Sequence, residues 1–122
     1  MTAPVGAVSK DEELRRAIHA SQVDDRGEPT SAAFRQHDMS VDVAGLAPLM
    51  ETRRRFATKR IAIFPCVILY EVGVEPRHAP IPDNESHAIV PGTLSQSKAR
   101  KVKASVTSVI GALDTVDEDI AD

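Results

Sequence analysis

The run IAIFPCVILY, residues 61–70, decides how this chain folds. Nearly all of its residues are apolar and the run is too short to cross a bilayer, so it predicts a strand that is buried on both faces. Pro65 cannot donate to a sheet ladder and therefore predicts a break inside the run. Beyond the break two alternatives stay open, a strand over residues 66–72 or a buried helical turn. Gly73 ends the run in both.

The composition is that of one globular domain. A chain of 122 residues with 42% hydrophobic and 27% charged residues can bury a core without disulfides or a metal. Aromatic residues make up only 3%, so the core must be mainly aliphatic. Tyr70 is the only tyrosine and tryptophan is absent, which argues against a site that stacks bases or sugars.

Cysteine content and the N-terminal sequence predict a cytoplasmic protein. Cys66 is the single cysteine, so no internal disulfide can form and a reducing compartment is indicated. The first residues lack the basic and apolar segments of a secretion signal, and no later run is long enough to span a membrane. The net charge of −3 argues against general nucleic-acid binding.

The chain divides into three parts. Residues 1–8 are small and neutral and predict a flexible arm, residues 9–113 form one domain, and residues 114–122, DTVDEDIAD, predict an acidic tail. Within the domain, residues 10–20 fit both a helix, because Ser9 and Glu12 make a capping box, and a strand. Local rules favour the helix, but both stay open.

Two helices and several short strands complete the predicted fold. A helix begins at Pro48 and runs to about Ala57, and its basic end suits a helix C-terminus. Residues 39–41 predict a brief strand, and residues 87–90 predict a strand that pairs with the central run. A final helix, capped by Ser95 or Ser97, is predicted by one apolar stripe of Ala99, Val102, Val106, Val109, Ile110 and Leu113.

These elements predict a single small α+β domain. Its short, mainly antiparallel sheet is centred on residues 61–72 and 87–90, and the two helices cover it.

The sequence carries no strong catalytic or cofactor signature. It lacks a phosphate loop, a dinucleotide-binding fingerprint, paired cysteines and a nucleophile elbow. The spacing of its four histidines matches no usual zinc pattern, so we expect no metal site and no cofactor. These histidines are His19, His37, His78 and His87.

Polar residues at the edges of apolar segments predict a shared cleft. An arginine there would bind an anion or carboxylate through parallel hydrogen bonds, and a histidine would move a proton near neutral pH. The alternative is structural: Arg16 would pair with an acid such as Asp42, and His87 would bond a backbone carbonyl. The candidate cleft residues are Arg16, His19, Ser31, Asp42 and His87.

A second candidate site lies where the final helix begins. Ser95, Ser97 and Lys98 stand there with further cations, which the helix dipole disfavours unless an anion binds the free backbone N–H groups. The alternative is an exposed, solvated turn. The basic group at residues 53–60 could likewise contact an acidic partner, nucleic acid or the acidic tail.

The segments RRAIHASQV, PTSAAF, MSVD, HAIVPG and SQSKARK resemble those of a family of small bacterial proteins that has no assigned activity. The resemblance covers most of residues 14–103. It implies one domain in which these residues lie together: Arg16, His19, Ser31, Phe34, Ser40, Asp42, His87 and Gly92. An early arginine, a middle serine and a late polar residue are also similar to compact ADP-ribosyltransferase-like folds, which implies NAD as a substrate.

Two functions therefore remain as hypotheses. The first is a non-catalytic accessory protein of the bacterial cytoplasm, which binds another protein through its charged faces or its Pro-rich loop and which could also form a homo-oligomer. The second is a small ligand-binding protein or enzyme that uses the Arg/His/Ser cleft.

Overall fold

The computed structural model describes residues 6–113. In chain order its regular elements are β1 (Gly6–Ala7), β2 (Glu13–Ile18), η1 (Ala20–Gln22), η2 (Ser31–Phe34), β3 (Met39–Val43), η3 (Ala44–Leu46), α1 (Leu49–Arg55), β4 (Arg60–Pro65), α2 (Val67–Glu71), β5 (Arg77–His78), β6 (His87–Val90), α3 (Gln96–Ser105) and β7 (Ser108–Ile110).

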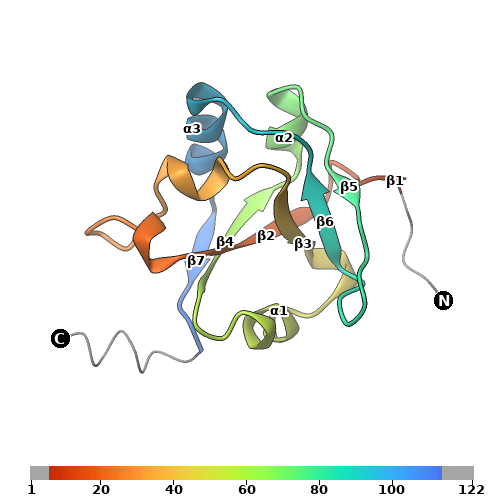
Figure 1. The fold of residues 1–122 in the computed structure, drawn as a ribbon, viewed down its shortest axis with the longest axis horizontal. Coiled ribbons are helices and arrows are strands. Elements are labelled where there is room, and N and C mark those ends of the chain that lie inside the picture. The colour runs from red at the N-terminus through yellow and green to blue at the C-terminus, as the bar shows by residue number, and fades with distance from the viewer. Residues whose placement is uncertain (1–5, 114–122) are drawn as a thin grey trace.

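The strands form one antiparallel sheet in the order β1-β5-β6-β3-β2-β4-β7. Figure 1 shows α2 and α3 on one side of this sheet and α1 on the other. The predicted single α+β domain with a mainly antiparallel sheet is confirmed.

The central run breaks at Pro65, as its sequence predicts. β4 ends at Pro65, and after Cys66 the chain forms α2, so the buried helical turn is the correct alternative. β7 pairs only with residues 61–63 of β4, so the missing N–H of Pro65 is not needed on that side of the strand.

Residues 13–18 are a strand, and the helix that local rules favour is wrong. β2 pairs with β4 along its whole length, from Glu13 opposite Pro65 to Ile18 opposite Arg60. The side chain of Glu12 does not cap a helix but accepts a hydrogen bond from the backbone N–H of Gly45 at 3.0 Å. Tertiary pairing here outweighs the local capping signal.

The final helix is shorter than its apolar stripe predicts. Ser95 does cap α3, since its Oγ accepts from the N–H of Lys98 at 3.2 Å. The helix ends at Ser105, however, and the chain continues as β7, in which Val109 packs against the core from a strand. β7 covers the free edge of β4, and this long-range pairing has no signature in local periodicity.

The strand at residues 87–90 is confirmed, but its predicted pairing is wrong. β6 pairs with β3 and β5 and not with β4, the strand of the central run. The strand at residues 39–41 is also confirmed and continues to Val43, so Asp42 lies inside β3.

The sheet begins earlier than the expected boundary at residue 8. β1 pairs with β5, and Val8 is fully buried in the core. Residues 1–5 and the whole acidic segment 114–122 lie outside the described residues. No helix in the described range is long and apolar enough to span a membrane.

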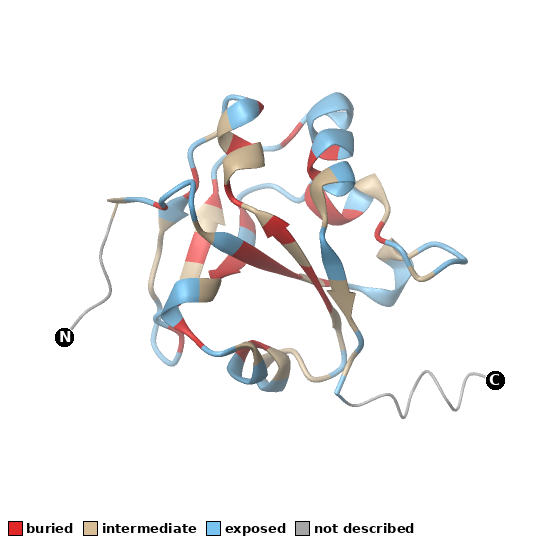
Figure 2. Ribbon diagram, turned by 180° about the vertical axis from the view of Figure 1, so that it is seen from behind, coloured by how far each residue is buried: buried red, intermediate tan, exposed pale blue. Residues whose placement is uncertain are grey.

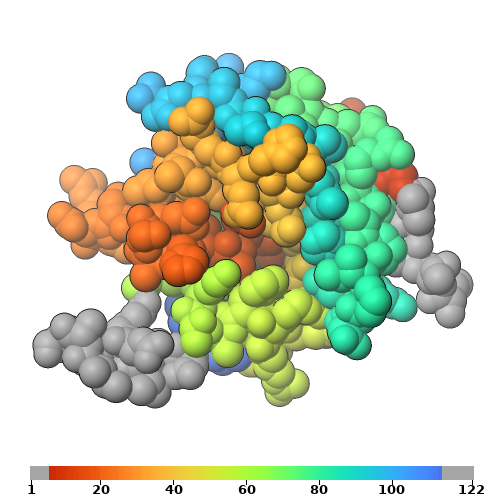
Figure 3. All heavy atoms as spheres, viewed as in Figure 1, coloured from red at the N-terminus to blue at the C-terminus, as the bar shows by residue number. Residues whose placement is uncertain are grey.

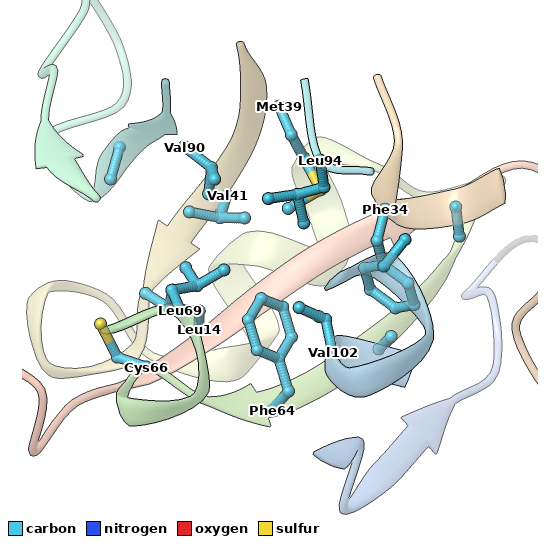
Figure 4. Packing of buried hydrophobic residues seen from close by; sticks show 14 of the residues in the cluster. Leu14, Phe34, Met39, Val41, Phe64, Cys66, Leu69, Val90, Leu94 and Val102 are labelled. Atoms are coloured by element: carbon cyan, nitrogen blue, oxygen red, sulfur yellow. The ribbon is translucent and has the colours of Figure 1, made fainter. Parts of the chain in front are cut away.

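The main core lies between the sheet and the layer of α2, α3 and η2. Figure 2 shows buried residues on the strands and on the inner sides of the helices. In Figure 4, Phe34 and Phe64 come together beside Val102; their rings meet edge to face, with centroids 5.8 Å apart. Burial in this core, with a smaller effect of Glu12, raises the pKa of the Cys66 thiol to about 11.

Candidate functional site

Two consecutive arginines of β2 lie on opposite faces of the sheet. Successive side chains of a strand alternate between faces, so Arg15 points toward α1 while Arg16 points toward the core layer. Both are buried, with exposed fractions of 8% and 7%. Burying a guanidinium is costly unless its N–H groups find acceptors, and the two residues meet this requirement differently.

Arg15 belongs to a closed network around a buried acid. Its Nη1 donates to Ala47 O at 2.8 Å and to Thr52 Oγ1 at 3.0 Å, and Thr52 Oγ1 donates to Asp42 Oδ2 at 2.9 Å. Asp42, only 2% exposed, also accepts from Arg55 Nη1 at 2.8 Å and from Asn84 Nδ2 at 2.9 Å. These hydrogen bonds join β2, β3, α1 and the loop before β6 into one network.

Within residues 6–113, the hydrogen-bond acceptors of the Arg16 side chain are neutral groups. Its Nε donates to Ala33 O at 3.0 Å, Nη1 to Ser40 O at 3.0 Å and Nη2 to Gln36 Oε1 at 2.7 Å. Among the described residues, no carboxylate forms an ion pair with Arg16. Desolvation by burial lowers the pKa of its guanidinium.

The backbone opens where Arg16 lies. β2 and β3 pair only through Leu14 with Val43 and Arg15 with Asp42, and beyond these pairs the two strands separate. The carbonyl of Ser40 therefore accepts from the Arg16 side chain. A cleft lies where the two strands separate, and it is lined by Arg16 and Ala17 of β2 and by Ser40 of β3.

The cleft has a volume of about 240 Å³. Figure 3 shows a hollow at this place, between the orange segment before β3 and the yellow-green segment after α1. Its lining residues are Arg16, Ala17, His19, Gln22, Gln36, Ser40, Phe56 and Lys59.

The lining of the cleft is positively charged and favours a negatively charged ligand. It contains two cations, Arg16 and Lys59, together with the polar side chains of His19 and two glutamines, and none of its residues is an aspartate or a glutamate. Lys59 is half-buried, and its Nζ lies 5.9 Å from the centre of the Phe56 ring, which favours an ordered ammonium group. A site with this charge balance suits a carboxylate or a phosphate.

A serine and a histidine meet at the wall of the cleft. Ser40, which lines the cleft, places its Oγ 3.1 Å from His87 Nε2, and His87 Nδ1 lies 2.7 Å from Ala79 O. A carbonyl oxygen can only accept, so Nδ1 carries a proton. In the neutral ring Nε2 is then an acceptor, and the Ser40 hydroxyl donates to it.

The structure brings together only part of the predicted cleft set. Arg16 and His19 line the cleft, and His87 lies behind its wall next to Ser40. Ser31 lies apart, with its Oγ 3.4 Å from Gln96 Nε2, and Asp42 is enclosed in the structural network.

The structural alternative is correct for His87 and wrong for Arg16. His87 does bond a backbone carbonyl, that of Ala79, whereas Arg16 bonds carbonyls and an amide instead of Asp42. Gln36 and Lys59 also line the cleft, although the sequence does not predict them there. No local signal could have placed them there, because they reach it from segments before β3 and after α1.

The second candidate site, at the start of α3, lies on the surface. Ser95 Oγ is used in capping α3, and Ser97 and Lys98 are exposed. Within residues 6–113, no group of three or more histidines, cysteines or acids is placed to hold a metal ion.

A larger groove, of about 640 Å³, lies between α3, β7 and the loop before η2. It is open, and Glu28 stands in it together with Arg100 and Lys103, so its charges are mixed.

Comparison with protein-family models, with curated proteins and with solved structures gives no match for this chain. The case for a function therefore rests on the geometry and the electrostatics of the cleft.

Proposed function

We propose that this protein binds a small anion, a carboxylate or a phosphate, in the cleft between β2 and β3. The observation that carries the proposal is Arg16, a buried guanidinium held by neutral groups in the described structure and bordering an open cleft. A guanidinium has five N–H donors, and its three bonds within the protein leave donors available for a ligand. The nearby ammonium of Lys59 adds a second positive charge.

The size of the cleft limits the ligand. At about 240 Å³ it holds the equivalent of about eight water molecules, which suits a small organic acid or inorganic phosphate. Pockets for drug-sized ligands and cofactors typically measure about 300–1,000 Å³, so this cleft is small for a dinucleotide such as NAD. We therefore favour small-anion binding over an NAD-using, ADP-ribosyltransferase-like activity. The buried, unpaired thiol of Cys66 supports the reducing cytoplasm as the compartment.

A titration with inorganic phosphate and with succinate tests this proposal. Isothermal calorimetry and thermal unfolding are measured at constant ionic strength, with chloride as the reference anion, because general screening affects every surface charge. Lys59→Gln should weaken binding roughly tenfold, since it removes one charge-assisted contact. Lys98→Gln is the matched control, an exposed lysine outside the cleft, and should bind as the wild type does.

Two results would contradict the proposal. One is an absence of binding by the wild type to both anions. The other is equal binding by Lys59→Gln and the wild type together with a loss in Lys98→Gln, which would move the site to the start of α3.

Binding of another protein is a second candidate function. Large apolar side chains are exposed at Leu46 in η3, at Met50 in α1 and at Ile81 in the Pro-rich loop. Arg55 of α1 donates to Asp83 O in that loop. Such side chains favour contact with a partner surface. A photo-crosslinking residue at positions 50 and 81 should capture the same protein at both, and a control at exposed Glu71 should not. Different products at positions 50 and 81 would contradict a shared binding surface.

A further inference from the structure

We infer that Ser40 and His87 form a nucleophile and general base that hydrolyse a small ester carrying a negative charge. The inference rests on the proposed anion site, because the same cleft would hold the substrate. It goes beyond binding, because it assigns a reaction to the bound ligand.

The first step of the argument is the geometry of the pair. The distance of 3.1 Å between Ser40 Oγ and His87 Nε2 lies within the range for proton transfer from a nucleophile to its base. The bond between Nδ1 and Ala79 O, at 2.7 Å, orients the ring and leaves Nε2 as the acceptor. A backbone carbonyl thus occupies the place of the acid that orients histidine in a catalytic triad.

The second step is the position of the pair. Ser40 is exposed and lines the cleft, while His87 is half-buried and approaches the hydroxyl from β6. A ligand in the cleft therefore meets the hydroxyl without displacing the base.

The third step is the charge next to the nucleophile. Arg16 Nη1 donates to the carbonyl of Ser40 itself, so the guanidinium lies beside the residue that attacks. Its positive charge at the lining of the cleft favours a substrate that carries a negative charge. Lys59 lines the same cleft and can hold a second, unreactive carboxylate of the substrate.

The reaction balances without a cofactor. Ser40 Oγ attacks the ester carbon, His87 Nε2 takes the hydroxyl proton, and the bond to the leaving oxygen breaks as that oxygen receives the proton. Water then attacks the acyl group on Ser40, gives a proton to His87, and the proton returns to Ser40 Oγ. The net products are a carboxylic acid and an alcohol.

The probe is the mono-p-nitrophenyl ester of succinic acid, and p-nitrophenyl butyrate serves as its uncharged counterpart. Nitrophenol release is followed by absorbance, and the acyl group is located by intact mass and peptide mapping. We expect wild-type protein to be acylated on Ser40 and to prefer the charged ester. Ser40→Ala should carry no acyl group, and His87→Gln should react roughly 100-fold more slowly.

A second histidine–hydroxyl pair provides the matched control. His37 Nδ1 lies 2.9 Å from Thr93 Oγ1 on an exposed surface outside the cleft, so His37→Gln should react as the wild type does. Circular dichroism and thermal unfolding of each variant separate loss of chemistry from loss of fold.

Succinate binding, measured on the same samples, separates this inference from the proposed function. Wild-type protein that binds succinate but gains no acyl group on Ser40 would overturn the inference and leave anion binding in place. An acyl group found on lysines only, or equal rates in the wild type and Ser40→Ala, would overturn it as well. Failure to bind succinate would instead count against the anion site.

Discussion

Arg15 and Arg16 are neighbours in β2 and are almost equally buried, yet they occupy different environments. Arg15 lies on the α1 face in a network that contains Asp42, and the charges in that network belong to the protein. Arg16 lies on the core face and is bonded to neutral groups beside an open cleft. The difference is one of charge compensation: a carboxylate lies in the network of Arg15, whereas the hydrogen-bond acceptors of Arg16 within residues 6–113 are neutral.

The largest expected effect is on the closed network. Asp42→Ala removes the acceptor of three side chains, those of Thr52, Arg55 and Asn84, and leaves the donors of Thr52 and Asn84 buried. We expect a loss of about 3–5 kcal/mol in the free energy of unfolding, measured by urea denaturation. Asp25→Ala, at an exposed loop position, is the control and should stay within about 0.5 kcal/mol. A loss below about 1 kcal/mol for Asp42→Ala would show that the network on the α1 face contributes little to stability, which would contradict the comparison with Arg16.

The next effect compares the two arginines directly. Arg15→Lys and Arg16→Lys each keep the charge and lose hydrogen bonds, so each should destabilise the protein by about 1–3 kcal/mol. The two variants should differ in how far added phosphate stabilises them. Arg15→Lys should keep the stabilisation that phosphate confers on the wild type, and Arg16→Lys should lose most of it. Thermal unfolding with and without phosphate measures both. Equal responses to phosphate in the two variants would break the comparison.

A smaller effect is expected at the rim of the network. The side chain of Arg55 is 21% exposed, and its bond to Asp42 Oδ2 is 2.8 Å long. Arg55→Gln leaves Asp42 with two other donors, so we expect a loss of about 1–2 kcal/mol, below that of Asp42→Ala. Urea denaturation in low and high salt would measure it, with Arg54→Gln, an exposed neighbour, as the control. A loss as large as that of Asp42→Ala would contradict the ranking.

The last expected effect concerns the core face and is confined to high pH. The pKa of the Cys66 thiol is raised from 9.0 to about 11, so the folded protein binds this proton more tightly than the unfolded chain does. Its contribution to stability is complete below pH 9 and is lost as the pH rises toward 11. Cys66→Ala should show a shallower decline in unfolding free energy over that window. Parallel curves for the wild type and the variant would refute the assignment to the thiol.

Much of the fold could be predicted from local patterns. Pro65 marked the end of β4, Ser95 marked the cap of α3, and the basic residues after Pro48 marked the end of α1, because each acts through its own backbone or through the helix dipole. The class of the fold followed from these elements.

The candidate site was predicted only in part. Arg16 and His19 were expected in a cleft and line one, but Ser31 and Asp42 were expected there and lie elsewhere. In the sequence, Lys59 stands out only as part of the basic group at residues 53–60. Its place in the cleft depends on how the chain turns after α1, and that turn has no local signature.

The sequence by itself determined where apolar segments begin and end, because side-chain chemistry and backbone restrictions act within a few residues. Only the tertiary structure decided that residues 13–18 are a strand, that β7 follows α3 and that β2 separates from β3 beyond Arg15. Those outcomes depend on pairing between segments far apart in the chain, whose strength depends on packing around the whole sheet.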